Sequence, residues 1–185
     1  LLEITIHNLI TDGEVDLRDF LSRADVLAAT GHTVLISDYL EYFRLVGYLS
    51  RYTNRSIAIT LGAGGLNELF NEVHYQHLEG GTLEAFGRLF KSDVKVFVYP
   101  MRMPETGECI TVSNFKPPTA LAELFHYLVS RGVIVQLDKY REEVLHIYSH
   151  DVLELIERGD DSWQEMVPPK VAAAIIERGL FGHRR

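Results

Sequence analysis

Short apolar runs alternate with longer segments of helical periodicity along the whole chain. Near the start, Leu2, Ile4 and Ile6 alternate with polar residues, which is the two-residue period of a β-strand. Four further apolar runs predict strands at 33–37, 57–61, 95–99 and 133–137. Apolar residues recur at helical spacing over 17–27, 40–52, 66–91, 121–128, 144–156 and 171–178. The pattern therefore predicts an α/β protein.

The order of these elements predicts how the strands are arranged. Strand and helix alternate with short connections, which is typical of a parallel sheet whose strands are joined by crossover helices. We therefore expect a doubly wound, mostly parallel, five-stranded Rossmann-like sheet with helices on both faces. The segment 101–116 departs from this order, because a turn at 104–107 and a return strand at 110–112 predict a β-hairpin.

Local signals mark where the first helix begins and ends. Asp16 is placed to cap it, and Asp19 adds a carboxylate in the first turn, where the helix dipole is positive. Gly31 is placed to end this helix, and Gly132 to end the helix before the last strand.

The length of 185 residues fits a single domain. We expect a core over residues 1–158 and a C-terminal tail and helix over 159–185, with Trp163 fixing the tail onto the body or onto a second subunit. The chain begins with Leu1 and Leu2 already in strand register and without a methionine. We therefore expect it to be the C-terminal fragment of a longer protein.

Composition narrows the classes of partner. The net charge of −8 at pH 7 and the isoelectric point near 5.5 disfavour nucleic acid, whose phosphates an acidic surface repels. No apolar run approaches the roughly 20 residues of a membrane-spanning helix, so no membrane partner is expected. The single cysteine, Cys109, suits a reducing compartment. We expect a cytoplasmic protein.

Candidate chemistry follows from the parallel sheet, because ligands bind beyond the carboxyl ends of such strands. The pattern places there His7, Asn8, Asp38, Glu41, Arg102, Asp138, Tyr140 and the run 62–67. The candidate ligand-binding residues that we select from this edge are Asp38, Glu41, Gly62, Gly64, Gly65, Asn67 and Arg102.

A glycine-rich connection at 62–65 is the most informative of these features. It follows a buried strand and precedes a helix, a geometry that presents backbone N–H groups to a phosphate or carboxylate. Arg102 would add charge-assisted hydrogen bonds to the same anion. The alternative is a structural connection in which the glycines supply positive φ angles and close helix–strand packing. The run lacks the glycine pattern of dinucleotide-binding and P-loop proteins, so both interpretations stay open.

Asp38 and Glu41 place two carboxylates after the strand at 33–37. Such a pair could bind Mg²⁺ or a ribose hydroxyl, or act as acid and base. The alternative is helix capping, with Ser37 or Asp38 as the cap and Glu41 in the first turn. The two roles are compatible with each other.

Two histidine pairs lie at helical spacing, His74 with His77 and His146 with His150. Neither pair has a cysteine partner or an HExxH pattern, so we expect solvated helix surfaces and no metal site. Cys109 has no base near it in the sequence, and we predict no nucleophilic role for it. The sequence identifies no catalytic residue.

Six segments carry a family resemblance: ISDYLEYFRL at 36–45, HLEGGTLE at 77–84, GRLFK at 87–91, VYPM at 98–101, WQEMVPP at 163–169 and LFG at 180–182. Together they resemble the C-terminal half of a family of long bacterial proteins of unsettled role, often labelled nicotinate- or nicotinamide-nucleotide adenylyltransferase. The label implies nucleotide metabolism. Enzymes of that kind carry a GxFxPxHxGH loop after the first strand, where this chain has His7, Asn8, Leu9 and Ile10, so no catalytic residue is carried over.

These observations lead to two functional predictions. The first is a domain that binds a small anionic metabolite or nucleotide at the carboxyl edge of the sheet, as part of an enzyme of nucleotide metabolism whose N-terminal portion is its partner. The cofactor is not identified, although a nucleotide or Mg²⁺ fits the residues. The alternative is a non-catalytic assembly or regulatory domain, with subunit contacts made by the aromatic helix at 39–52 and the tail at 163–169. We expect a homo-oligomer.

Overall fold

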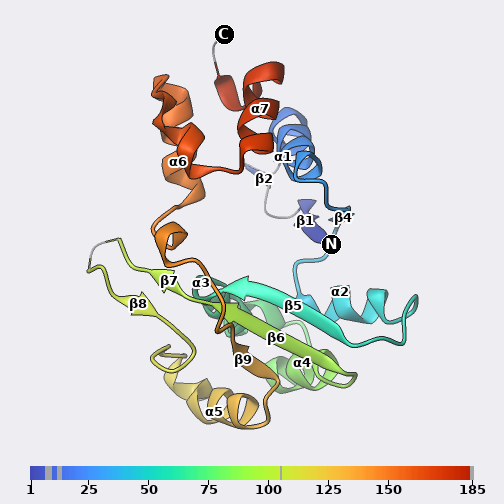
Figure 1. Cartoon of the computed structure of the whole chain (residues 1–185). Coiled ribbons are helices and arrows are strands. Elements are labelled where there is room, and N and C mark those ends of the chain that lie inside the picture. The colour runs from blue at the N-terminus through green and yellow to red at the C-terminus, as the bar shows by residue number, and fades with distance from the viewer. Residues whose placement is uncertain (7–9, 12–13, 105, 184–185) are drawn as a thin grey trace. The chain divides into compact units, whose positions relative to one another are not determined.

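The computed structural model describes residues 1–6, 10–11, 14–104 and 106–183. Two compact units make up the chain (Figure 1): unit 1 comprises Leu1–Leu40 and Ile147–Arg185, and unit 2 comprises Glu41–His146. Unit 1 is therefore built from both ends of the chain, whereas unit 2 is one continuous segment. His7 and Asn8, expected at the binding edge, and Glu105 of the expected turn lie outside the described residues.

The described part of unit 1 contains a parallel and an antiparallel strand pair together with three α-helices. Its elements are β1 (Leu2–Thr5), β2 (Ile10–Thr11), β3 (Glu14–Val15), α1 (Leu17–Ala29), β4 (Val34–Ser37), α6 (Ser149–Arg158), the 3-10 helix η5 (Asp161–Met166), α7 (Pro169–Arg178) and the 3-10 helix η6 (Leu180–Gly182). β1 pairs in parallel with β4, with Leu2 opposite Val34, and α1 is the crossover between them. β2 and β3 form the antiparallel pair.

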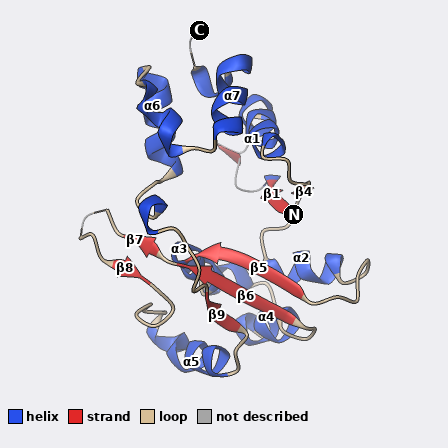
Figure 2. Ribbon diagram, in the orientation of Figure 1, coloured by secondary structure: helices blue, strands red, loops and turns tan. Residues whose placement is uncertain are grey.

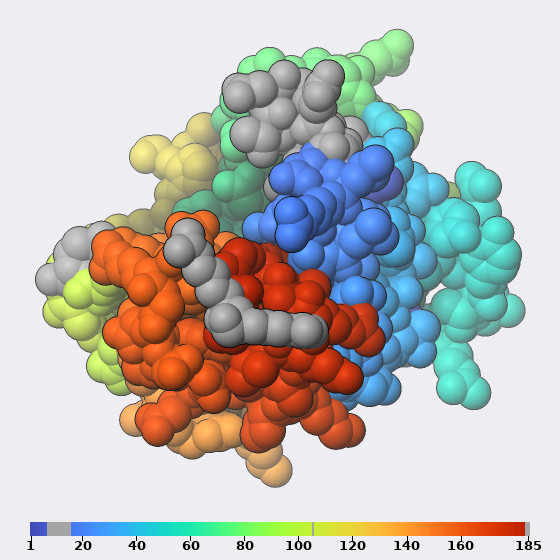
Figure 3. All heavy atoms as spheres, turned by 90° about the horizontal axis from the view of Figure 1, so that it is seen from above, coloured from blue at the N-terminus to red at the C-terminus, as the bar shows by residue number. Residues whose placement is uncertain are grey.

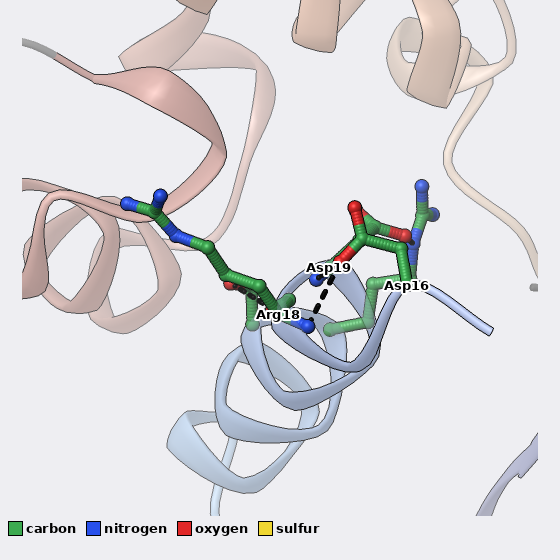
Figure 4. Close-up of polar contacts among 5 residues, drawn as sticks. Asp16, Arg18 and Asp19 are labelled. Carbon is green, nitrogen blue, oxygen red and sulfur yellow. Dashed lines mark hydrogen bonds and ion pairs between the residues drawn. The ribbon is translucent and has the colours of Figure 1, made fainter.

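The boundaries of α1 follow from local chemistry. Asp16 is its N-cap, and one carboxylate oxygen accepts hydrogen bonds from the backbone N–H groups of Arg18 at 2.9 Å and Asp19 at 3.0 Å (Figure 4). Beyond the other end, Gly31 adopts a φ of +84°, which residues with a side chain rarely adopt. Both sequence predictions for this helix are confirmed.

A small apolar core holds unit 1 together. Trp163 on η5 is fully buried. The buried residues of its cluster are Val152, Ile156, Val171, Ala172 and Ile175. α1 packs against α7, and Arg178 on α7 pairs with Asp25 on α1 at 2.7 Å. The C-terminal segment thus contributes to the core of unit 1, and the expectation that Trp163 fixes this segment onto the body is confirmed.

Unit 2 is organised around a three-stranded parallel sheet of order β5-β6-β9 (Figure 2). Its elements are α2 (Tyr42–Leu49), β5 (Ile57–Gly62), α3 (Ala63–Leu69), η2 (Glu72–Tyr75), α4 (Gly81–Leu89), β6 (Val94–Tyr99), β7 (Met101–Arg102), β8 (Cys109–Ile110), η3 (Thr119–Leu121), α5 (Ala122–Ser130), β9 (Ile134–Gln136) and η4 (Glu142–Val144). Ile57 lies opposite Val94, and Val96 opposite Ile134. β7 and β8 pair antiparallel, so the predicted hairpin is confirmed with shorter strands.

An aromatic cluster fills the core of unit 2. Phe70, which is fully buried, lies at ring-centroid distances of 4.9 Å from Phe86, 5.5 Å from Phe125 and 6.5 Å from Phe115. The Phe70–Phe125 pair is edge-on, an arrangement that aromatic rings favour. The cluster joins α4, α5 and the chain after α3 into one core.

The five parallel strands do not form one sheet, and this part of the prediction is wrong. β1 and β4 pair in unit 1, whereas β5, β6 and β9 pair in unit 2. An apolar run indicates that a strand is covered, but it carries no information on which strand lies beside it. The α/β class and the parallel pairing are confirmed. The expected division at residue 158 differs from the observed boundaries of the units, and a single domain over the whole chain stays a prediction.

Candidate functional site

The strands of the unit 2 sheet are parallel, so their carboxyl ends lie on one edge. β5 ends at Gly62, β6 at Tyr99 and β9 at Gln136. Ligands of parallel α/β sheets bind beyond this edge. All the predicted site residues except Asp38 belong to unit 2. Unit 2 therefore contains the main part of the candidate site.

The glycine-rich run forms no loop. Gly62 is both the last residue of β5 and the N-cap of α3, so the strand continues directly into the helix. Gly62 has a φ of −74°, and Gly64 and Gly65 lie within α3. Positive φ angles, one of the two structural reasons predicted for these glycines, are therefore not the explanation.

All three glycines instead lie close to a neighbouring side chain. A Cβ atom on Gly62 would lie 3.1 Å from the Tyr99 ring, one on Gly64 would lie 3.3 Å from Met101 Sδ, and one on Gly65 would lie 3.2 Å from Leu61 Cβ. These distances are shorter than nearly all real contacts of a Cβ atom, so any side chain here would displace its neighbour. The close helix–strand packing that the sequence offered as an alternative is confirmed.

Glu41 forms a charged cluster at the start of α2. Its Oε2 lies 3.3 Å from Arg44 Nε, and its Oε1 lies 3.4 Å from His77 Nε2. Arg44 Nη2 is also 3.0 Å from the same His77 nitrogen. The Glu41 side chain is only 9 % exposed, so this carboxylate holds α2 against the chain that precedes α4.

The negative charge of Glu41 affects the pKa of Tyr75, a buried residue of unit 2. Burial raises the pKa of the Tyr75 phenol well above its ordinary value of 10.0, and the negative charge of Glu41 adds to the rise. The Tyr75 hydroxyl donates a hydrogen bond to the Leu69 carbonyl oxygen at 2.8 Å. Tyr75 is therefore a protonated structural residue at neutral pH.

Asp38 and Ser37 belong to unit 1 and do not cap α2. The N-cap of α2 is Glu41, whose side chain makes no capping hydrogen bond, so the predicted capping arrangement is wrong. The Ser37 hydroxyl instead donates a hydrogen bond to Glu3 Oε1 at 2.5 Å and accepts one from the Tyr39 N–H at 3.3 Å. Asp38 directly follows β4, as expected.

Arg102 is engaged within the hairpin. Its Nη1 donates a long hydrogen bond to the Gly107 carbonyl oxygen at 3.4 Å, and its backbone pairs with Cys109. The neighbouring Met101 lies against Gly64, so the structure does bring the hairpin and the glycine segment together. Asn67 is exposed on α3, one turn beyond the end of β5.

A cleft of about 520 Å³ runs along β9, from Gly132 before the strand to Asp138 and Tyr140 beyond its carboxyl end. Its polar lining residues are Thr111, Ser113, Gln136, Asp138 and Tyr140, and its apolar ones include Val112, Val129 and Ile134. Asp138 and Tyr140 are residues that the sequence places beyond the last strand. One end of the cleft therefore lies where the edge rule for parallel sheets predicts a ligand.

Gln136 positions one wall of this cleft. Its Nε2 donates to the carbonyl oxygens of Val98 at 3.1 Å and Leu137 at 3.2 Å, and its Oε1 accepts from the Val112 N–H at 2.8 Å. One side chain thus joins β6, β9 and the segment after β8. Sequence reasoning missed Gln136, although a glutamine inside an apolar strand signals a buried hydrogen-bonding role.

A compact polar turn at 111–114, to which Gln136 is bonded, provides further lining residues of the cleft. Asn114 Oδ1 accepts from the Thr111 N–H at 2.7 Å, and the Thr111 and Ser113 hydroxyls lie 2.8 Å apart. Asn114 Nδ2 donates to the Cys109 carbonyl oxygen at 3.0 Å. These bonds fix two hydroxyl groups at the cleft. Sequence reasoning missed Thr111 and Ser113, although serine, threonine and asparagine close together indicate such turns.

The histidines make pairwise contacts with carboxylates. His74 Nε2 lies 3.0 Å from Glu68, and His150 Nε2 lies 3.0 Å from Asp151. Within the described ranges, no group of three or more His, Cys, Asp or Glu side chains is placed to hold a metal ion. No helix in the part of the chain that the structure describes combines the length and apolarity needed to cross a membrane.

A comparison of the chain with known protein families, with curated proteins and with solved structures found no match.

Proposed function

We propose that unit 2 binds a small anionic metabolite of the nucleotide or sugar-phosphate class at the carboxyl edge of its sheet. The observation that carries the proposal is the cleft along β9, which combines Asp138, Tyr140 and the hydroxyls of Thr111 and Ser113. The resemblance to proteins labelled as adenylyltransferases favours a nucleotide among these ligands. A cytoplasmic location belongs to the same proposal, since nucleotides are abundant there and Cys109 is a free thiol.

Residues of unit 2 are suited to bind the ribose, the base and the phosphate of such a ligand. A carboxylate such as Asp138 accepts hydrogen bonds from vicinal ribose hydroxyls. The ring of Tyr140, which is 38 % exposed, offers a face on which a base can stack. Arg102 is not among the lining residues of the cleft, but it lies in the hairpin that leads to Thr111, and we expect its guanidinium to provide the cation for the phosphate. Mg²⁺ would enter together with that phosphate, because it is commonly held by substrate phosphates and few carboxylates.

Calorimetric titration of the full chain with AMP, ribose 5-phosphate and inorganic phosphate, with and without Mg²⁺, tests the proposal. We expect saturable binding of AMP or ribose 5-phosphate and about tenfold weaker binding in Asp138→Asn, which loses a charge-assisted hydrogen bond. The matched control is Glu123→Gln, which removes an exposed carboxylate from α5. Absence of saturable binding, or unchanged affinity in Asp138→Asn, would overturn the proposal.

A second candidate is assembly, and it is favoured by an exposed apolar face on α1. Leu17 and Leu21 lie one turn apart and are 68 % and 60 % exposed. Trp163 is fully buried within unit 1, whereas Leu17 and Leu21 are accessible to a second copy. If α1 joins two copies, light scattering should show a lower mass for Leu21→Glu than for the wild type. An unchanged mass would count against assembly through this face.

A further inference from the structure

Unit 1 contains an apolar cavity of about 440 Å³ among α1, α6, α7 and the end of β1. Its lining includes Ile4 on β1, Leu27 on α1, Val152 and Ile156 on α6, and Ile175 on α7. Figure 3 shows α1 in blue and α7 in red side by side at this face of unit 1, with α6 in orange beside α7. The cavity is distinct from the cleft of unit 2 and uses other residues.

The size and lining of the cavity indicate that the main part of its ligand is apolar. The volume of 440 Å³ lies within the range of about 300 to 1,000 Å³ of small-molecule sites. Val152, Ile156 and Ile175 are all less than a tenth exposed. The walls therefore consist of core side chains, which form no hydrogen bonds with water. Replacing water in such a space by a hydrocarbon chain is favourable in proportion to the apolar area covered.

Among the described residues that line the cavity, Arg23 is the charged one. Its Nε donates a hydrogen bond to Asp19 Oδ2 at 2.6 Å, which anchors the guanidinium and uses one of its five N–H donors. The side chain of Arg23 is 37 % exposed, which places its charge at the solvent boundary of an apolar space. The other N–H groups of the guanidinium can donate to a ligand carboxylate, and the Asp19 carboxylate beside them offsets part of the positive charge.

We propose that this cavity binds a medium-chain carboxylic acid, with the hydrocarbon chain among α1, α6 and α7 and the carboxylate paired with Arg23. The apolar walls select the chain, and the guanidinium selects the acidic head over a neutral one. The inference concerns unit 1 and does not depend on the ligand proposed for unit 2.

Titration of the full chain with decanoate, below the concentration at which the acid aggregates, tests the proposal. Trp163, the one tryptophan of the sequence, belongs to the same apolar cluster as Val152 and Ile156, so its emission reports on this cavity. We expect saturable heat in calorimetry together with a saturable change in Trp163 fluorescence. Acetate, which lacks the chain, should produce neither signal.

Variants and a neutral analogue test recognition of the carboxylate and of the hydrocarbon chain separately. Arg23→Gln should weaken decanoate binding at least tenfold, whereas the control Arg18→Gln, on the exposed side of the same helix, should leave it unchanged. Decanol should bind at least tenfold more weakly than decanoate to the wild type. Leu153→Phe, which adds volume to a partly exposed lining position, should abolish binding while circular dichroism shows the chain to be folded.

Several results would overturn the proposal. Absence of saturable binding of decanoate would remove it, as would equal affinity in the wild type and in Leu153→Phe. Equal affinity for decanol, or full affinity in Arg23→Gln, would show that the carboxylate is not recognised. An AMP titration that fails while decanoate binds would overturn only the function proposed for unit 2.

Discussion

Unit 2 packs its helices around three parallel strands and an aromatic cluster, and its cleft runs along β9, whereas unit 1 has two parallel strands and a cavity among three helices. A parallel sheet is stable when both of its faces are covered, and each added strand widens the surface on which helices pack. In unit 1, the helices come from both ends of the chain, and Trp163 is the largest side chain buried among them. The comparison teaches that a candidate ligand site can lie along an edge strand, as in unit 2, or among helices, as in unit 1.

The largest expected effect tests whether the two cores are energetically separate. Phe70→Ala should destabilise unit 2 by about 3 to 5 kcal/mol, because the lost ring leaves a cavity among its aromatic neighbours. Trp163 fluorescence follows unit 1, whereas far-ultraviolet circular dichroism follows both units. In urea, we expect the circular dichroism midpoint to fall clearly and the Trp163 midpoint to fall less.

The control for Phe70→Ala is Leu83→Ala. Leu83 is 70 % exposed on α4, so its truncation should change the free energy of unfolding by less than about 0.5 kcal/mol. Equal displacement of both midpoints in Phe70→Ala would show one cooperative core, contrary to the separation of the two units.

A matched pair of truncations compares the packing of the units directly. Leu89 on α4 and Ile156 on α6 are both 2 % exposed and both helical. Leu89→Ala should cost about 4 kcal/mol, whereas Ile156→Ala should cost about 2 kcal/mol, because Ile156 borders a cavity and has fewer packing contacts to lose. Urea unfolding curves give both values. A cost for Ile156→Ala equal to or above that for Leu89→Ala would show that unit 1 is as tightly packed as unit 2.

The sequence predicts local features of both units well, because their causes are local. Asp16 and Gly31 mark the ends of α1 through hydrogen bonding and backbone conformation within a few residues. Alternation of apolar and polar residues locates the first parallel strand, and short apolar runs locate the other four. The pairing of these strands depends on contacts between distant segments, and the prediction of a single sheet therefore fails.

For the candidate site, too, the features with local causes are predictable, and those that depend on distant residues are not. The edge rule for parallel sheets places Asp138 and Tyr140 correctly beside the cleft, since it needs only the strand order along the chain. The role of Gly62 depends instead on the ring of Tyr99, which lies in another strand. The bond from the Val112 N–H to Gln136 likewise joins residues 24 positions apart, and no local pattern encodes it.

Replacing each of the two glycines of α3 by alanine tests how closely α3 packs against its neighbours in unit 2. Alanine favours a helix over glycine by about 1 kcal/mol, so the outcome depends on which neighbour must move. Gly64→Ala meets the flexible end of Met101 and should stabilise unit 2 by about 0.5 kcal/mol. Gly65→Ala meets Leu61 Cβ, which is fixed to the strand, and should destabilise it by about 1 kcal/mol. Circular dichroism in urea measures both, and the reverse order would refute packing as the reason for these glycines.

The smallest expected effect concerns the pH dependence of unit 1. Asp160 caps η5 by accepting a hydrogen bond from the Ser162 N–H at 3.0 Å, and this bond lowers the pKa of Asp160 below its ordinary value of 3.8. Since the native state prefers the carboxylate, the unfolded state binds the proton first as the pH falls. The capping stability is therefore present at neutral pH and is lost as the pH falls from the ordinary value through the lowered one.

Asp160→Asn retains an acceptor but does not titrate, so it should flatten the fall in Trp163-monitored stability over roughly pH 5 to 3. The control Asp161→Asn leaves the capping carboxylate intact and should keep the wild-type slope. Because η5 carries Trp163, the loss belongs to unit 1, and the stability of unit 2 should depend on pH equally in Asp160→Asn and the wild type. A changed slope in both units would mean that the cap of η5 stabilises the chain as a whole.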